Sequence, residues 1–105
     1  MPGSTEDTPF GPDTIVFKVK GKMFALCSIN EFGSVNLKCD PERSIELREK
    51  YPQITPGYHM NKQHWNSVVL EGLPHSFIKE LIRHSYGLVR DSLSKKLRDE
   101  IELGI

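Results

Sequence analysis

Residues 14–29 constrain the fold most strongly, because they contain two runs of strand-forming residues joined by a two-residue turn. The first run, Thr14–Val19, is rich in β-branched and aromatic side chains, and the second returns over Met23–Ile29. Between them stands Lys20-Gly21, and glycine is the residue that most easily adopts the positive φ of a tight hairpin turn. This pattern predicts an antiparallel β-hairpin.

Regular pairing on either side of that turn gathers large apolar side chains on one face of the hairpin. It sets Phe17 opposite Phe24 and Ile15 opposite Leu26. A third strand is expected at residues 34–39, where apolar and polar residues alternate. The first part of the chain therefore predicts a meandering antiparallel sheet.

Helix signals follow the third predicted strand. Asp40-Pro41 combines a favourable N-cap with proline at the first helical position, and Pro52 ends the helix. Apolar residues recur at three and four positions over residues 74–90, which predicts a long amphipathic helix. Ser94 caps a shorter expected helix over residues 95–103.

The middle of the chain is expected to return to the sheet. Residues 52–57 are predicted to form a loop, and residues 58–61 and 65–70 two extended segments. The resulting order is three strands, a helix, two strands and two helices. This order predicts one α+β domain over residues 1–105, with an antiparallel meander of about five strands covered on one face by helices.

Composition and charge exclude some classes of protein. There is no apolar run of the ~18 residues that a membrane span needs, and the N-terminus is acidic and polar, so a cytoplasmic protein without a membrane partner is expected. In such a reducing compartment, Cys27 and Cys39 are expected to be free thiols. The 14 basic and 14 acidic residues cancel, although residues 56–98 hold seven Lys or Arg against three Asp or Glu.

A central segment concentrates polar and aromatic side chains that could form a recognition pocket. They are Tyr58, His59, Asn61, His64 and Trp65. The spacing of the two histidines suits opposite faces of a strand, and no carboxylate lies nearby, so neither a metal nor a cofactor is expected. Nothing in the sequence locates the histidine and carboxylate that would have to activate Ser67 or a thiol for catalysis. The segment is either a recognition surface or a structural corner.

Basic residues supply a second set of candidates, for contact with nucleic acid. Three lysines surround the hairpin turn, and three cations on the long helix lie within ~40° of one another around its axis. The alternative is that these side chains only face solvent. The candidates are Lys18, Lys20, Lys22, Lys62, Lys79, Arg83 and Arg90.

Several short blocks together resemble the MmcQ/YjbR family. They are Pro-Phe-Gly at 9–11, Phe-Lys-Val at 17–19, Gly-Lys-Met-Phe-Ala at 21–25, Asn-Leu-Lys-Cys-Asp-Pro at 36–41 and Gly-Tyr-His-Met-Asn-Lys-x-His-Trp at 57–65. The resemblance implies a fold similar to CyaY, the bacterial frataxin, and a DNA-binding role. It also implies a helix before Met1-Pro2-Gly3, whose absence would expose apolar surface on the sheet. A start upstream, a trimmed chain or a covering partner would each account for this.

The combined expectation is a non-enzymatic bacterial binding protein that contacts DNA through the basic hairpin and helix stripe. The alternative is a module that binds a small ligand or a protein, including a second copy of itself, around Tyr58 to Trp65. The response to salt separates these hypotheses, because phosphate contacts weaken steeply as salt rises.

Overall fold

The structure, a computed structural model, describes residues 3–8, 14–28, 33–57 and 64–103. Three helices and six strands lie within these residues. Their bounds in chain order are β1 (Ser4–Asp7), β2 (Thr14–Val19), β3 (Lys22–Ser28), β4 (Ser34–Lys38), α1 (Pro41–Lys50), β5 (Ile54–Pro56), β6 (Trp65–Val69), α2 (His75–Asp91) and α3 (Lys95–Leu103).

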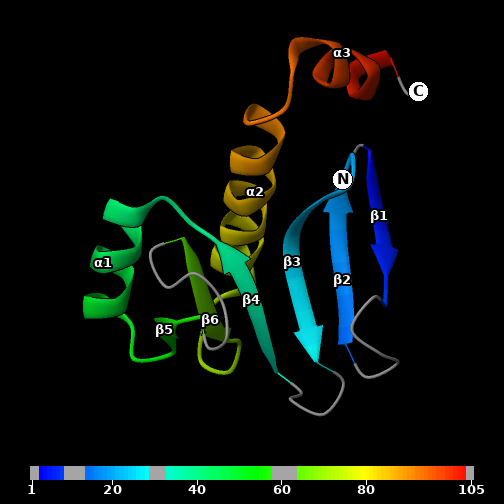
Figure 1. The fold of residues 1–105 in the computed structure, drawn as a ribbon. Helices are drawn as coiled ribbons and strands as arrows, with labels where there is room; N and C mark the ends of the chain where they lie inside the picture. Colours follow the sequence, from blue (N-terminus) through cyan, green and yellow to red (C-terminus); the bar gives the residue numbers. More distant parts are fainter. Residues whose placement is uncertain (1–2, 9–13, 29–32, 58–63, 104–105) are drawn as a thin grey trace.

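The strands form one open antiparallel sheet in the order β1-β2-β3-β4-β6-β5 (Figure 1). Helix α2 packs across one face of the sheet, α1 lies beside β5 and β6, and α3 lies at the end of the sheet near the β2–β3 turn (Figure 1). The α+β class and the helix-covered sheet are therefore confirmed. Helix α3 lies at the end of the sheet, and its Ile101 is buried there.

Two strands, β1 and β5, were not predicted from the sequence. β1 has the polar sequence Ser-Thr-Glu-Asp, and it pairs along the edge of β2 from Ser4↔Val19 to Asp7↔Val16. β5 lies in the segment expected to be a loop, and an edge strand tolerates its proline, Pro56. The sheet therefore has six strands among the described residues, and the extended segment expected at 58–61 lies outside them.

The predicted hairpin turn is confirmed, and the predicted pairing beyond it is wrong. Lys20 and Gly21 have φ values of 48° and 82°, so both central residues of the turn occupy the left-handed region, as a type I′ turn requires. The register then shifts by one residue, so that Phe17 pairs with Ala25 instead of Phe24. Phe24 is the additional residue of a β-bulge in β3.

The helices begin and end within one residue of the positions expected from the sequence. The Asp40 side chain accepts hydrogen bonds from the backbone N–H groups of Glu42 (3.0 Å) and Arg43 (3.3 Å), which confirms it as the N-cap of α1. The backbone N–H of Leu97 donates to the hydroxyl of Ser94 at 3.4 Å at the start of α3. Local capping chemistry therefore sets the starts of α1 and α3.

A buried serine joins two strands of the sheet to α2. Ser85 is 0% exposed, and its hydroxyl donates to the carbonyl oxygen of Phe24 at 2.5 Å. The Ser85 hydroxyl oxygen in turn accepts a hydrogen bond from the backbone N–H of Lys38 at 2.8 Å. The last paired residues of β3 and β4 on this side are Ala25 and Leu37, so the serine hydroxyl bridges the positions where the bulge interrupts direct pairing.

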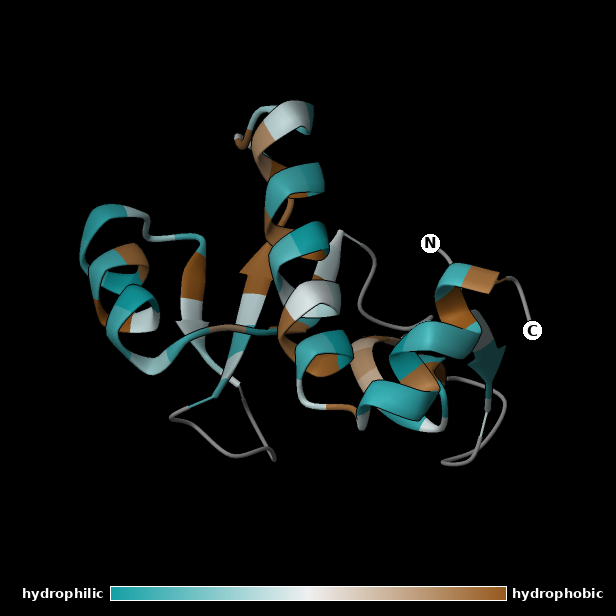
Figure 2. Cartoon of the chain, turned by 90° about the horizontal axis from the view of Figure 1, so that it is seen from above, coloured by the Kyte–Doolittle hydropathy of each residue, from teal (hydrophilic) through white to brown (hydrophobic). Residues whose placement is uncertain are grey.

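Each helix carries hydrophilic and hydrophobic residues on its turns, as expected for helices that cover a core on one side (Figure 2). On α2 the buried residues are Leu81, Ser85 and Val89, and the Tyr86 ring contacts Phe24 edge-on with ring centres 5.4 Å apart. Within the described ranges, no helix is both long and apolar enough to cross a membrane.

Candidate functional site

The two most distinctive sequence blocks lie side by side on β4 and β6. Residue pairs across these strands include Lys38↔Trp65 and Asn36↔Ser67. The backbone N–H of Cys39 also donates to the carbonyl oxygen of His64 at 2.7 Å, which extends the contact beyond the strand ends. Strand pairing therefore brings the Asn-Leu-Lys-Cys-Asp-Pro block against the His-Trp end of the central segment.

Alternation along these strands separates their side chains into two faces. Val35, Leu37 and Val68 belong to the core on the α2 side. Their strand neighbours therefore point to the opposite face, and the Ser67 hydroxyl donates there to the Asn36 amide oxygen at 2.6 Å. We call this group the outer patch; it comprises Asn36, Lys38, Trp65 and Ser67.

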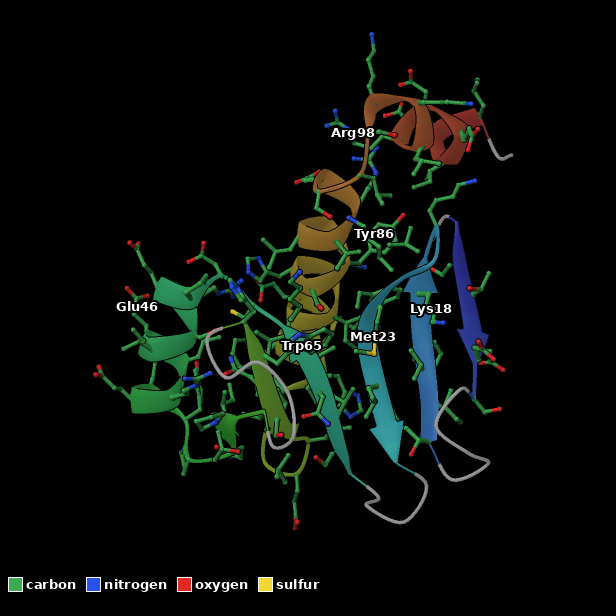
Figure 3. The ribbon with its side chains drawn as sticks, in the orientation of Figure 1. Lys18, Met23, Glu46, Trp65, Tyr86 and Arg98 are labelled. Carbon is green, nitrogen blue, oxygen red and sulfur yellow. The ribbon has the colours of Figure 1, made fainter. Side chains whose placement is uncertain are left out.

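Trp65 is nearly buried although it belongs to the outer patch. Its exposed fraction is 8%, and Figure 3 shows it beside β4, the strand that pairs with β6. A Cβ atom on Gly57 would lie 2.9 Å from the Trp65 Cβ, so the glycine leaves the space that the tryptophan needs. His64 is half-buried, and the other three pocket candidates, Tyr58, His59 and Asn61, lie outside the described residues.

A buried polar cluster supports the patch from the α1 side of β6. Asn66 is 2% exposed, and its side-chain oxygen accepts a hydrogen bond from Nε of Arg48 at 2.7 Å. Arg48 also donates to the Trp65 carbonyl oxygen at 3.3 Å, and the Asn66 amide donates to the Ser44 hydroxyl at 3.4 Å. These bonds hold β6 to α1, and the sequence patterns do not predict them.

A second group of ionisable side chains joins α1 to α2. Arg43 donates two hydrogen bonds of 2.7 Å to the carboxylate of Glu80, and this contact raises the pKa of Arg43. His84 Nε2 accepts a bond from the backbone N–H of Asp40 at 3.3 Å. Burial first, and then the nearby positive charge of Arg43, lowers the pKa of His84. The imidazole therefore acts as a neutral acceptor that anchors the start of α1.

The two cysteines are free, as expected, and burial raises the pKa of each thiol. A thiol must ionise to act as a nucleophile or a metal ligand, so these environments suit packing. Among the described residues, no three His, Cys, Asp or Glu side chains are grouped so that they could hold a metal ion.

The hairpin lysines do not form a free basic tip. Lys18 pairs with Asp7 at 3.5 Å and Lys20 with Glu100 at 3.4 Å, and Nζ of Lys22 donates to the Ser92 hydroxyl at 3.5 Å. Both acids come from elements distant in sequence, β1 and α3, so these pairs were not predictable from spacing.

The basic residues of α2 are also partly paired with acids. Arg90 pairs with Asp91 at 3.6 Å and with Glu102 of α3 at 2.9 Å. Lys79 and Arg83 are exposed, and neither makes an ion pair with a described residue. Lys62 lies outside the described residues. The structure therefore places the described nucleic-acid candidates on the hairpin and on α2, and several of them already contact acids.

Comparisons with known proteins agree with this architecture. A family model described as YjbR matches residues 1–88. The chain is 43% identical over 98 residues to the YbdF protein of Escherichia coli O157:H7, an alignment that covers 91% of this chain and 80% of the relative.

Two solved structures are also similar. The crystal structure of Deinococcus radiodurans protein DR2400 matches with a TM-score of 0.90 and 44% identity, covering 97% of this chain and 80% of that one. A crystal structure of a protein from Pseudomonas syringae matches with a TM-score of 0.70 and 35% identity, covering 82% and 86%. The chain belongs to the YjbR family, as its sequence blocks indicate.

Proposed function

We propose that this chain is a non-enzymatic binding protein that contacts its ligand through the outer patch. The observation that carries the proposal is the β4–β6 register, which assembles the two most distinctive sequence blocks at one place. The patch offers an amide, an ammonium group and a hydroxyl, and it contains no carboxylate. This chemistry favours a ligand with anionic or hydrogen-bond-accepting groups.

The contacts of the candidate nucleophiles support a binding role over a catalytic one. The Ser67 hydroxyl donates to an amide oxygen, which is not a base that could activate it. Both thiols have raised pKa values, and the neutral His84 is engaged with the backbone of Asp40. Catalysis by Ser67 or His84 would require each to give up its hydrogen bond within the sheet or to the start of α1.

Backbone NMR with anionic probes tests the outer patch. Inorganic phosphate and adenosine monophosphate, added at millimolar concentration, are expected to shift the amides of the patch. Lys38→Ala should abolish these shifts, because it removes the patch's positive charge, while the exposed Lys95→Ala is the matched control. Shifts that are absent, or that survive unchanged in Lys38→Ala, would refute the assignment of the ligand site to this patch.

DNA binding through α2 is a second candidate, and we infer it from Lys79 and Arg83. These cations lie one helical turn apart, are exposed and make no ion pair with a described residue. Phosphate contacts made by so few cations should give weak binding with a shallow dependence on salt.

The slope of binding against salt measures how many cations take part. If only Lys22, Lys79 and Arg83 contact phosphates, log K should fall against log salt with a slope of about −3; all seven sequence candidates would give about −6. Random duplex DNA and fluorescence anisotropy provide the assay. Lys79→Glu/Arg83→Glu should abolish binding, and the exposed pair Lys95→Glu/Lys96→Glu serves as the control. Affinity no better than millimolar in low salt would eliminate the DNA candidate.

A further inference from the structure

Helix α3 lies near the β2–β3 turn, where it brings acids to two of the cations that the sequence named as nucleic-acid candidates (Figure 1). Glu100 pairs with Lys20 of the turn at 3.4 Å. Glu102 pairs with Arg90 of α2 at 2.9 Å. The two cations belong to different elements, and one short helix supplies a carboxylate to each. Helix α3 therefore occupies positions that a polyanion would take beside these cations.

The cations of α2 form one row along the helix. Lys79, Arg83 and Arg90 lie within about 40° of one another around the axis, and at 1.5 Å per residue they span about 16 Å along it. A duplex carries about one phosphate charge per 1.7 Å of its axis, so a row of this length suits a nucleic-acid backbone better than a single small anion. Glu102 lies against the C-terminal end of this row.

The charges within α3 are arranged against the dipole of the helix. Residues 95–98 are mainly basic and residues 99–102 mainly acidic, so the first turn contains no acid and the last turn no base. A helix dipole favours the opposite order, with acids at the N-terminal end and bases at the C-terminal end. Nine residues are also too few for a stable isolated helix. Helix α3 therefore depends on its contacts with the rest of the fold.

The apolar attachment of α3 is small. Within this helix only Ile101 is buried, and Leu97 is partly buried against the core. Ile101 lies against Gly3, where an added Cβ would come within 3.0 Å of its side chain. The side chains of Glu100 and Arg90 are each 28% exposed, so salt can screen both ion pairs. Competing anions should therefore weaken the attachment of α3.

We propose that residues 99–102 of α3 are an autoinhibitory strap on a nucleic-acid-binding surface formed by the hairpin turn and α2. In the docked strap, Glu100 and Glu102 take the place of phosphates beside Lys20 and Arg90. A duplex displaces these carboxylates, and the released strap loses its helical form because it loses its supporting contacts. The proposal rests on the DNA candidate described above, to which it adds two cations and an internal competitor.

Neutralising the two acids tests the strap in the full chain. Glu100→Gln/Glu102→Gln should strengthen binding to random duplex DNA about two- to thirty-fold, the range expected for two exposed ion pairs that compete with phosphates. Where the wild-type slope of log K against log salt is about −3, the variant's slope should be about −4.5, because two more cations contact phosphates. Anisotropy of a labelled duplex measures both values.

A matched control separates local charge from net charge. Glu46→Gln/Glu49→Gln removes two exposed acids of α1, a helix at the other side of the molecule from α3 (Figure 1), and it changes the net charge by the same amount. At about 0.1 M salt such distant charges are screened, so DNA affinity should change by less than about twofold.

Hydrogen exchange reports displacement of the strap directly. Saturating duplex DNA should lower the protection of the Ile101 amide in the wild-type chain, while the amide of the buried Val89 in α2 keeps its protection. Ile101→Ala weakens the apolar attachment, so it should lower protection across residues 99–102 without DNA and also strengthen DNA binding.

The outcomes distinguish the strap from the DNA candidate on which it rests. DNA affinity equal in the wild type, Glu100→Gln/Glu102→Gln and the control would refute the strap and leave DNA binding through α2 in place. Protection of α3 that persists in saturating duplex would do the same. Affinity no better than millimolar in every variant would refute both. Polyglutamate that binds more tightly than duplex DNA would assign the surface to an acidic polypeptide and overturn the proposal as well.

Discussion

Replacing Ser85 by alanine tests whether one hydroxyl joins β3, β4 and α2. The Ser85 hydroxyl bonds the Phe24 carbonyl at 2.5 Å and the Lys38 N–H at 2.8 Å, in a side chain that is 0% exposed. Alanine removes both bonds and leaves two backbone groups without partners. Each such group costs about 1–3 kcal/mol, and Lys38 is only half-buried, so we expect the free energy of unfolding to fall by about 2–4 kcal/mol.

Urea denaturation measures this change directly. With a typical dependence of about 1–3 kcal/mol per M, the midpoint should fall by at least about 0.7 M. Ser76→Ala, at an exposed position of the same helix, is the matched control and should change stability by less than about 0.5 kcal/mol. Hydrogen exchange should also show that the Lys38 amide loses protection.

The opposite result would be informative. If Ser85→Ala unfolds at the wild-type midpoint and the Lys38 amide keeps its protection, the hydroxyl does not connect the strands. The interruption of the β3–β4 pairing would then be stabilised by packing alone.

Three further changes have defined outcomes. Asn66→Ala should destabilise the fold by about 1.5–3 kcal/mol in urea, because Arg48 loses its 2.7 Å acceptor; an unchanged midpoint would contradict this. Gly57→Ala should cost about 1–3 kcal/mol and alter tryptophan fluorescence, since the new Cβ meets Trp65 at 2.9 Å; native fluorescence and stability would disprove the clash. The lowered pKa of His84 means that the unfolded chain takes up a proton near its ordinary 6.5 while the folded chain stays neutral, so stability should fall as pH drops below about 6.5. His84→Gln should make the urea midpoint depend less on pH. An equally steep pH profile in this variant would show that His84 is not the cause.

Local signals predicted much of the fold because the physics behind them is local. The Lys20-Gly21 turn, the Asp40 cap and the periodicity of α2 each depend on a few neighbouring residues, and all three are confirmed. The polar strand β1 has no such signal, because its pairing with β2 is a tertiary contact. The bulge at Phe24 likewise depends on α2, whose Ser85 bonds the displaced carbonyl.

The candidate site was predicted only in part for the same reason. Its composition indicated that His64 and Trp65 belong to a special segment, but no spacing rule relates them to Asn36 and Lys38 across an intervening helix and strand. Pairing of β4 with β6 creates that relation. The burial of Trp65 on the outer side of the sheet also depends on the missing side chain of Gly57.

Folding redistributes the charge that the sequence shows as a local basic excess. The acids that balance residues 56–98 lie in the first half of the chain and in the last helix. The fold places Glu102 against Arg90 of α2, and it also places Asp7 and Glu100 against cations of the hairpin. Exposed ion pairs of this kind contribute little to stability, but they cancel the field that would attract a polyanion.

The polar outer patch and the apolar surface therefore lie on opposite faces of the sheet. On β4, Asn36 and Lys38 point to the outer patch, whereas Val35, which precedes them, points to the opposite face and lines an apolar groove. If ligands bind to both faces, β4 contributes side chains to both sites, and any coupling must be reciprocal, so each ligand changes the affinity of the other by the same factor.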